Sequence, residues 1–448
     1  MSRRTTFRFV RGLAPHAVLL VIAALTYGLV PAVASAEPLE DTDSGQLHLD
    51  FQVGAGAYYS QRNYQQSATQ TEGTSSWQEG YVKLGLSGKR KLAAGSEFYA
   101  TVSALSKRTF GDGDPAGWTT RQDHGAALSE AYVGWRSGDM FPALGKDGVH
   151  FTAGRRRLFV GDGFLIAKDG LSLGRDYAGG AYDRGGVYYL APENSFAQTA
   201  ALRLGGEQGL VSEFMWLKSH NPGQARPEFA VVSLMGKSLR NLIGISYIEV
   251  LDTDKALDAK QRKGVRTYSV RTQGDMGVKN LFVSAEFAHQ RRHSGNERAW
   301  YGEVGWTFDD LPGKPSVNYR YSYFSDRFDP LLYGNVRGLG TWVQGELAGN
   351  YAGPFNSNTK VHHINFKATP AENFSVGLLA YRFSSLNKSI GRLDGYEIDL
   401  YAEWIVDRFY VMPAIGWYKP RYDSANGGSQ IGTTKGNLWG MLLVTYTF

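Results

Sequence analysis

The chain has 448 residues, 55 glycines, no cysteine and a formal net charge of +6. The lack of cysteine excludes disulfides, thiolate metal sites, cysteine nucleophiles and a lipid-anchored N-terminus. The mean hydropathy is −0.31, and beyond the N-terminus no apolar stretch approaches the length of a spanning helix, which excludes a helical membrane protein.

The N-terminus has the pattern of a secretory signal peptide. Four arginines among the first eleven residues precede an apolar run over residues 17–30, and the small residues Ala34 and Ala36 follow. Because the apolar run is too short to span a membrane, we predict a signal peptide over 1–36 and a mature domain over 37–448. Arg3 and Arg4 leave twin-arginine export as an alternative, although the apolar residue of that motif is displaced here.

Removal of this segment takes away four positive charges and no negative ones, so the mature chain is nearly neutral. The sequence pI of 9.1 is therefore a property of the precursor and does not indicate a nucleic-acid partner. No linker or internal repeat divides the mature chain, which we expect to form one domain.

Segments of about ten residues alternate apolar and polar side chains along nearly the whole mature chain. In residues 396–404, for example, Ile398 and Leu400 alternate with Glu397 and Asp399. A carboxylate facing hydrocarbon is costly, so the acidic face must line the interior. The period-two pattern predicts an all-β fold, a transmembrane antiparallel β-barrel whose strands face lipid on one side and a lumen on the other.

Aromatic residues near strand ends distinguish this barrel from a soluble β-sandwich, which would share the alternation. The residues that fit interfacial girdles are Trp300, Trp306, Phe308, Tyr319, Tyr321, Tyr323, Phe409 and Trp417. The last strand, residues 437–448, alternates apolar side chains and ends on Phe448. That ending resembles the terminal strand read by barrel-assembly machinery and predicts a location in the bacterial outer membrane.

Turn chemistry gives the number of strands. Short connections, which we expect in the periplasm, are 88–96, 205–209, 309–315, 369–373 and 406–407. Longer polar connections, which we expect outside the cell, are 60–76, 106–126, 158–185, 251–263, 384–394 and 419–436. With both termini in the periplasm and 327–358 as one loop, the barrel has about eighteen strands. A strand over 338–349 would leave an odd total, so we reject that alternative.

A barrel of this size encloses a lumen wide enough for a solute unless loops fill it. By strand alternation the inward face carries Asp50, Glu79, Lys83, Glu130, Arg136, Arg156, Arg203, Glu286, Glu303, Arg320, Lys367, Glu397, Asp399 and Glu403. Such a mixed lining produces local fields, in which carboxylates can hold arginines extended at a constriction. This face alone does not identify the solute.

The densest basic segment starts with Gly154-Arg155-Arg156-Arg157 and continues through Gly161-Asp162-Gly163 into a long loop. The planar guanidinium suits carboxylates and phosphates, so a series of such groups could pass an anionic polymer between weak sites. The candidate solute-binding residues are Arg155, Arg156, Arg157, Asp162, Lys168, Arg175 and Arg184 in this segment and Lys83, Glu130, Arg136 and Arg320 on other strands. In the alternative, only Arg156 faces inward, and Arg155 and Arg157 lie at the rim, where they bind lipopolysaccharide or loop carboxylates.

Four short motifs carry a family resemblance. They are Leu128-Ser129-Glu130-Ala131-Tyr132-Val133, Gly154-Arg155-Arg156, Gly161-Asp162-Gly163 and Phe328-Asp329-Pro330-Leu331. Together they resemble the alginate export family of outer-membrane barrels, loosely over the mature chain and most over 128–175, with Gly-Arg-Arg in place of the family's Gly-Arg-Gln. The resemblance implies an eighteen-stranded barrel whose arginine-rich constriction passes a uronic-acid polysaccharide, with periplasmic scaffold proteins as partners.

The sequence offers little to support catalysis. Gly170-Leu171-Ser172-Leu173-Gly174 matches a nucleophile-elbow string, but that mechanism needs a strand before and a helix after the serine, and a glycine-rich loop surrounds this one. His289 and His293 would share a metal only on a helix, and the adjacent His362 and His363 point to opposite faces of a strand. We therefore expect no enzyme activity, no metal site and no cofactor.

Three functions remain as hypotheses. The leading one is an anion-selective porin that exports an anionic polysaccharide such as alginate. The second is a general or substrate-specific diffusion porin that imports small solutes or oligosaccharides, and the third is a barrel enzyme acting through Ser172. The expected partners are the anionic polysaccharide, outer-membrane lipid and lipopolysaccharide, and periplasmic scaffold proteins of a secretion complex, without nucleic acid.

Overall fold

The computed structural model describes residues 37–42, 44–334, 336–337, 339 and 345–448. The predicted signal peptide over 1–36 lies outside the described residues. None of the helices formed by the described residues is long and apolar enough to cross a membrane.

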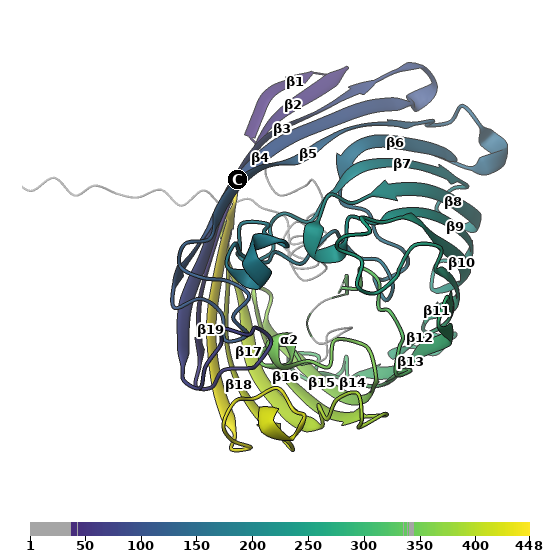
Figure 1. Cartoon of the computed structure of the whole chain (residues 1–448). Helices are drawn as coiled ribbons and strands as arrows, with labels where there is room; N and C mark the ends of the chain where they lie inside the picture. Colours follow the sequence, from purple (N-terminus) through teal and green to yellow (C-terminus); the bar gives the residue numbers. More distant parts are fainter. Residues whose placement is uncertain (1–36, 43, 335, 338, 340–344) are drawn as a thin grey trace, which may run out of the picture.

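The described residues form a closed ring of eighteen antiparallel strands, β2 to β19, in which each strand pairs with its neighbours in sequence (Figure 1). Pairing of β19 with β2 closes the ring. The strands are β2 (Gly45–Ser60), β3 (Ser75–Lys91), β4 (Glu97–Gly111), β5 (His124–Arg136), β6 (Val149–Arg156), β7 (Phe196–Leu204), β8 (Gly209–Lys218), β9 (Glu228–Lys237), β10 (Asn241–Asp252), β11 (Arg266–Gly274), β12 (Leu281–Arg292), β13 (Gly295–Thr307), β14 (Ser316–Phe324), β15 (Thr359–Ala371), β16 (Phe374–Ser385), β17 (Gly395–Val406), β18 (Phe409–Pro420) and β19 (Asn437–Thr447). The predicted all-β barrel of about eighteen strands is confirmed.

A further strand, β1 (Glu37–Thr42), lies outside the ring and pairs with the first residues of β2, over 45–49. The C-terminal strand β19 pairs with the same edge of β2 further along, over 52–60. Between the two, Phe51 and Phe448 exchange backbone hydrogen bonds of 3.1 and 2.8 Å. Both ends of the described chain therefore lie at one end of the barrel, and together they satisfy the edge of β2.

Most short turns lie at that same end, which we call the turn end, and most long connections lie at the other, the loop end. The exceptions are the short connection over 293–294 at the loop end and the longer one over 137–148 at the turn end. The single connection predicted over 327–358 is confirmed, because β14 pairs directly with β15; the described part of this connection contains only the short helix α2 (Gly349–Ala352). The predicted loop over 106–126 is too long, since β4 continues to Gly111 and β5 starts at His124. Polar residues there continue the ladder beyond the apolar part of the wall, where composition alone indicates a loop.

The remaining helices in the described residues are single 3-10 turns in these connections. They are η1 (Ala93–Gly95), η2 (Pro142–Leu144), η3 (Tyr177–Gly180), η4 (Pro222–Gln224) and η5 (Ser424–Asn426). None of them is long enough to form a separate layer, so the architecture is the barrel and the loops inside it.

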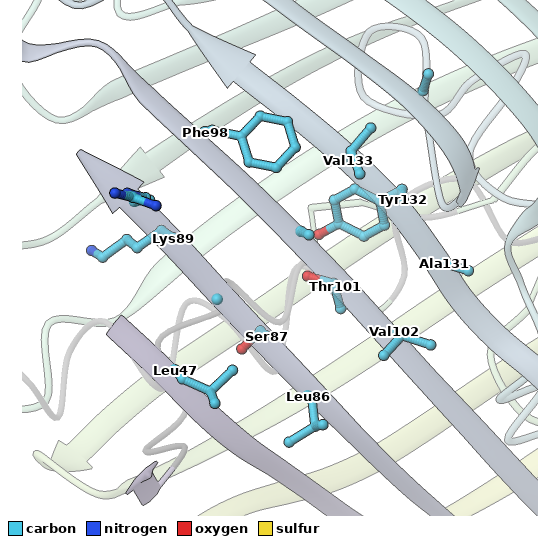
Figure 2. A pocket seen from close by; sticks show the side chains of 14 residues that line it. Leu47, Leu86, Ser87, Lys89, Phe98, Thr101, Val102, Ala131, Tyr132 and Val133 are labelled. Carbon is cyan, nitrogen blue, oxygen red and sulfur yellow. The ribbon is translucent and has the colours of Figure 1, made fainter. Parts of the chain in front are cut away.

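The outer wall is apolar, as a lipid-facing surface must be. Figure 2 shows part of it, where Leu86, Phe98, Val102 and Val133 project from neighbouring strands around a shallow groove of about 590 Å³. The groove lies on the outside of the barrel and is not part of the lumen. Six of the predicted girdle aromatics are exposed outward: Trp300, Trp306, Phe308, Tyr319, Phe409 and Trp417.

Two long loops fold back into the barrel and pack there (Figure 1). The connection over 157–195 and the described part of that over 325–358 are joined by backbone hydrogen bonds, from Leu332 N–H to the Leu165 carbonyl (3.1 Å) and from Ala167 N–H to the Leu332 carbonyl (2.9 Å). Phe164 and Phe328 beside this junction are buried against the β7–β14 wall. The interior is therefore partly filled by the chain itself.

A second interior cluster, which we call the aromatic core, consists of Trp77, Trp118, Tyr188, Tyr351 and Trp439. The ring of Tyr351, on α2, lies 5.8 Å from Trp77, 5.8 Å from Trp118 and 5.2 Å from both Tyr188 and Trp439. These rings fill the side of the lumen next to β2, β3 and β15–β19. Each such pair contributes about 0.5–1.5 kcal/mol beyond its buried area, so the core fixes the inner loops on this wall.

Candidate functional site

Gly154 sets the position of the three arginines that follow it. Its φ is +126°, and a Cβ at this position would lie 2.3 Å from the Ala131 carbonyl oxygen. The β6–β7 pairing shifts register here, between Gly154 and Arg156, which is the signature of a β-bulge. Strict alternation would turn Arg155 and Arg157 away from the lumen. With the bulge, and with the chain entering the inner loop, these side chains lie inside the barrel and not at the outer rim.

Arg155 belongs to an ion network centred on Glu193. The Glu193 carboxylate lies 2.9 Å from Lys107 Nζ, 3.4 Å from Arg155 Nη2, 3.5 Å from Arg184 Nε and 3.1 Å from His220 Nε2. Burial alone would raise the pKa of Glu193, but the hydrogen bond with His220 and the charges of Lys107 and Arg184 outweigh it and hold the pKa below its ordinary value. The network therefore fixes the inner loop to β4, β6 and the β8–β9 connection.

Arg184 has further partners within the same loop. Its Nη1 donates to the carbonyl oxygens of Asp169 (2.5 Å) and Gly170 (3.2 Å), and the Asp169 carboxylate accepts from Ser219 Oγ at 2.9 Å. With its side chain 4% exposed, Arg184 is a structural residue of the loop. Arg155, 12% exposed, also serves mainly to hold the loop through its ion pair with Glu193.

The carboxylate of Asp162 also makes contacts that hold the fold together. Its carboxylate lies 3.1 Å from Arg337 Nε and accepts from the Tyr301 hydroxyl at 3.2 Å, while Arg337 Nη2 lies 2.7 Å from Glu303. These contacts join both inner loops to β13. Arg320, on β14, is 3% exposed and sits directly opposite Glu303 in the ladder.

Four further predicted residues occupy more open positions. Lys83 and Glu130 form an ion pair of 2.5 Å across the inner wall of β3 and β5. Arg136 lies near the turn end, with its guanidinium 5.0 Å from the ring centroid of Tyr99. Arg175 is exposed in the inner loop.

Arg156, Arg157 and Lys168 are half-buried, and no carboxylate within the described residues forms an ion pair with them. Arg156 lies over the ring of Tyr132, with 4.7 Å from the guanidinium carbon to the ring centroid, and its Nε has no hydrogen-bond partner. Arg157 Nε donates only to the carbonyl of Ala167 (3.2 Å). Burial lowers the pKa of Lys168 to about 8, and the charge of Arg157 acts in the same direction.

Three inward cations on neighbouring strands extend this group. Arg203 on β7 donates to the Gly206 carbonyl (2.7 Å), Arg271 on β11 contacts Met235 Sδ (2.9 Å), and Lys237 on β9 has no hydrogen bond or ion pair within the described part of the chain. We call the six residues Arg156, Arg157, Lys168, Arg203, Lys237 and Arg271 the basic stripe. It lies on and beside the inner wall from β6 to β11, away from the aromatic core.

Sequence reasoning placed Arg203 on the inward face but did not include it among the candidate residues, and it missed Lys237 and Arg271. Alternation contains the signal for both. Lys237 shares its parity with the buried Met235 and Ser233, and Arg271 shares it with the buried Ser269. What alternation cannot give is which inward cations have a carboxylate partner.

Ser172, in the nucleophile-elbow string, lies in a loop without a strand before it or a helix after it. Its side chain is fully buried, and Lys107 Nζ lies 3.3 Å from its Oγ while also pairing with Glu193. A fully buried hydroxyl cannot reach a solute, so this geometry does not form a nucleophile. Across the described ranges, no group of three or more His, Asp or Glu side chains is arranged to hold a metal ion.

A closed barrel of eighteen strands with an apolar outer wall, inner loops and a charged interior defines a β-barrel of the bacterial outer membrane. The protein is located in the bacterial outer membrane.

Comparison with solved structures supports this fold. OccK7 (OpdD) of Pseudomonas aeruginosa is 12% identical with a TM-score of 0.55, covering 89% of this chain and 98% of that one. A BenF-like porin from Pseudomonas fluorescens Pf-5 is 10% identical with a TM-score of 0.58, covering 90% and 98%. OccAB2 of Acinetobacter baumannii is 9% identical with a TM-score of 0.55, covering 89% and 98%. No family model and no curated protein matches the sequence.

Proposed function

We propose that the chain is a substrate-specific diffusion channel that admits small anionic solutes through the outer membrane. The observation that carries the proposal is the basic stripe, six inward cations without an ion-pair partner in the described chain. Other lumenal cations, such as Lys83 and Lys107, are neutralised by carboxylates at 2.5 and 2.9 Å. The stripe is therefore a continuous part of the interior with positive charge left to attract a mobile anion.

The basic stripe runs along the inner wall of the barrel, a position that suits the passage of an anionic solute. A partly desolvated cation attracts an anion more strongly than one in bulk water, and several weak sites in series let the solute leave one site for the next. Arg156, Arg157, Arg203 and Arg271 carry guanidinium groups, whose geometry matches carboxylates and phosphates. Lys168 contributes a point charge next to Arg157.

The comparisons support a channel for small solutes better than an exporter. The fold neighbours are outer-membrane channels, one of them named as a BenF-like porin, and no comparison points to an alginate exporter. Export of a uronic-acid polymer, the leading hypothesis from the sequence, needs a passage that a long chain can thread. The aromatic core and the joined inner loops occupy much of the interior, which favours small solutes. The buried Ser172 gives no support for an enzyme.

Single-channel recording in planar bilayers tests the proposal. We expect anion selectivity in the wild-type protein, block by small carboxylates, and a shift toward equal anion and cation permeability in Arg157→Gln/Lys168→Gln. Arg108→Gln, which removes an outward-facing arginine of β4, is the matched control and should leave selectivity unchanged. A cation-selective wild-type channel contradicts the proposal. Block by polyuronate but not by small carboxylates supports the export function instead.

A further inference from the structure

The outer wall carries arginines at the loop end of β11–β13 that do not face the lumen. Arg266 on β11 and Arg291 on β12 are direct cross-strand partners. Arg298 on β13 lies opposite His289, which is the next outward-facing residue of β12 after Arg291 in the direction of the turn end. All three arginines are exposed on the outside. Like charges placed opposite each other destabilise a sheet, so this arrangement needs a compensating anion.

One carboxylate supplies part of that compensation. Glu249 on β10 lies 3.0 Å from Arg266 Nε and accepts from the Tyr247 hydroxyl at 2.6 Å. Arg291 and Arg298 have no ion pair within the described chain and lie instead over the rings of Tyr268 (5.6 Å) and Tyr323 (5.9 Å). Two positive charges therefore remain uncompensated, side by side on the wall.

An apolar groove begins directly below them. It has a volume of about 640 Å³, and its outward lining includes Ile243, Val270, Phe287 and Trp300, with Arg298 and Tyr323 at the loop end. The indole of Trp300 stacks on Tyr323, with 6.2 Å between ring centroids. Tyrosine and tryptophan prefer the level where hydrocarbon meets headgroups, which places the arginines at headgroup level and the groove among acyl chains.

We propose that this wall binds one phosphorylated glycolipid of the outer leaflet. Arg291 and Arg298, with Arg266 beside them, hold its phosphates, and one acyl chain lies in the groove along Val270, Phe287 and Trp300. The loop end is the end that we expect to face the outside of the cell. This inference concerns the lipid-facing surface and does not depend on the proposed transport function.

The groove of Figure 2 shows why the position of the charges matters. It is also apolar, but its basic residues, Lys89 and Arg90, lie at the turn end of β3. A phosphorylated lipid of the outer leaflet cannot place its headgroup there. The two grooves thus offer a comparison on one molecule between charges at the loop end and charges at the turn end.

The test measures glycolipid retained by the full-length mature barrel after reconstitution in phosphatidylcholine nanodiscs containing diphosphoryl lipid A, by native mass spectrometry. We expect the wild-type protein to retain one lipid A. Arg291→Gln/Arg298→Gln should reduce retention on the order of thirtyfold, since each basic residue at an anionic lipid surface strengthens binding about fivefold and the two factors multiply. Fully dephosphorylated lipid A should bind no better to the wild type than to the double variant.

Two further variants, one a control and one a test of the groove, separate this site from general membrane contact. Arg108→Gln removes an outward arginine of β4 that stacks on Phe110 at 5.2 Å, and it should retain lipid A as the wild type does. Trp300→Ala keeps the arginines but opens the groove, and it should weaken retention. Heat-dependent gel mobility confirms that each variant is a folded barrel. Equal retention by the double variant overturns the proposal. A double variant that changes from oligomer to monomer without losing lipid A also overturns the proposal, because Arg291 and Arg298 would then form a contact between copies of the chain.

Discussion

Arg262 and Asp329 form a buried bidentate ion pair, with Nε–Oδ2 and Nη2–Oδ1 distances of 2.7 and 2.9 Å. Arg262 belongs to the β10–β11 connection and Asp329 to the inner loop after β14. The same aspartate exchanges backbone hydrogen bonds of 2.9 and 3.1 Å with the side chain of Gln290 on β12. Asp329 thus anchors the start of the inner loop to the barrel wall.

Asp329→Asn should destabilise the barrel by about 3 kcal/mol, because removing one partner leaves Arg262 buried without its counter-charge. This is the low end of the usual range, since Arg262 Nη1 keeps hydrogen bonds of 3.0 Å to Gln224. Urea unfolding in lipid vesicles measures the effect. Asp252→Asn is the control, because its pair with Lys263 is exposed to solvent and contributes little to stability.

The ion pair also predicts a pH dependence. Burial would raise the pKa of Asp329, but the charges of Arg262 and Lys260 hold it well below the ordinary value for an aspartate. A carboxyl group with a lowered folded pKa stabilises the fold above its unfolded pKa, and that stabilisation is lost as the pH falls further. The stability difference between wild type and Asp329→Asn should therefore shrink in acid. A difference that stays constant down to strongly acid pH would contradict this assignment.

Gly154→Ala should displace the arginines that follow the bulge. The new Cβ meets backbone atoms of Ala131 and Tyr132 at 2.3 and 2.7 Å, and the φ of +126° is unfavourable for any other residue. We expect a loss of about 1–3 kcal/mol and reduced anion selectivity in planar bilayers. Gly302→Ala is a matched control, since nothing lies within 4 Å of its Cβ position. Unchanged selectivity in Gly154→Ala would show that the bulge does not position the basic stripe.

The barrel could be predicted from the sequence because the features that determine it lie close together along the chain. Alternation on each strand, turn residues and the terminal Phe448 are all readable along the chain, and they gave the strand number and the position of the β14–β15 loop. The interior could not be predicted in the same way. Glu193 collects three cations from three different elements, and nothing around it in the sequence indicates those contacts.

The candidate residues illustrate the same limit. Alternation placed Arg156 inward, but the bulge at Gly154 changes the parity for Arg155 and the fold-back of the loop brings Arg157 inside. Whether an arginine is free or paired depends on loops that meet only in three dimensions, as Asp162 and Arg337 do. The sequence therefore found the region of the site but not which of its charges remain available to a solute.

Lys168 predicts how transport depends on pH. Burial and the nearby Arg157 lower its pKa to about 8, with Glu346 opposing them, so Lys168 is charged below that pH and neutral above it. Anion selectivity should therefore fall as the pH rises from about 7 to 9. Reversal potentials in a salt gradient measure this. Lys168→Arg should remove the pH dependence, because arginine stays charged throughout this range. Lys168→Gln should show, at every pH in this range, the lower selectivity that the wild type reaches near pH 9. If selectivity declined with pH in Lys168→Arg as it does in the wild type, the pH dependence would come from another titratable group.

Tyr351 tests whether the aromatic core narrows the lumen. Its ring is fully buried among Trp77, Trp118, Tyr188 and Trp439, and replacing it with alanine leaves a cavity that costs about 3–5 kcal/mol for a large aromatic residue. We expect Tyr351→Ala to loosen the inner loops and raise single-channel conductance. Anion selectivity should persist, because the basic stripe lies on the β6–β11 wall and keeps its charges. Trp417→Ala, which removes an outward-facing aromatic of β18, should change neither quantity. If Tyr351→Ala lost selectivity without gaining conductance, the core would position the basic stripe and would not limit the passage.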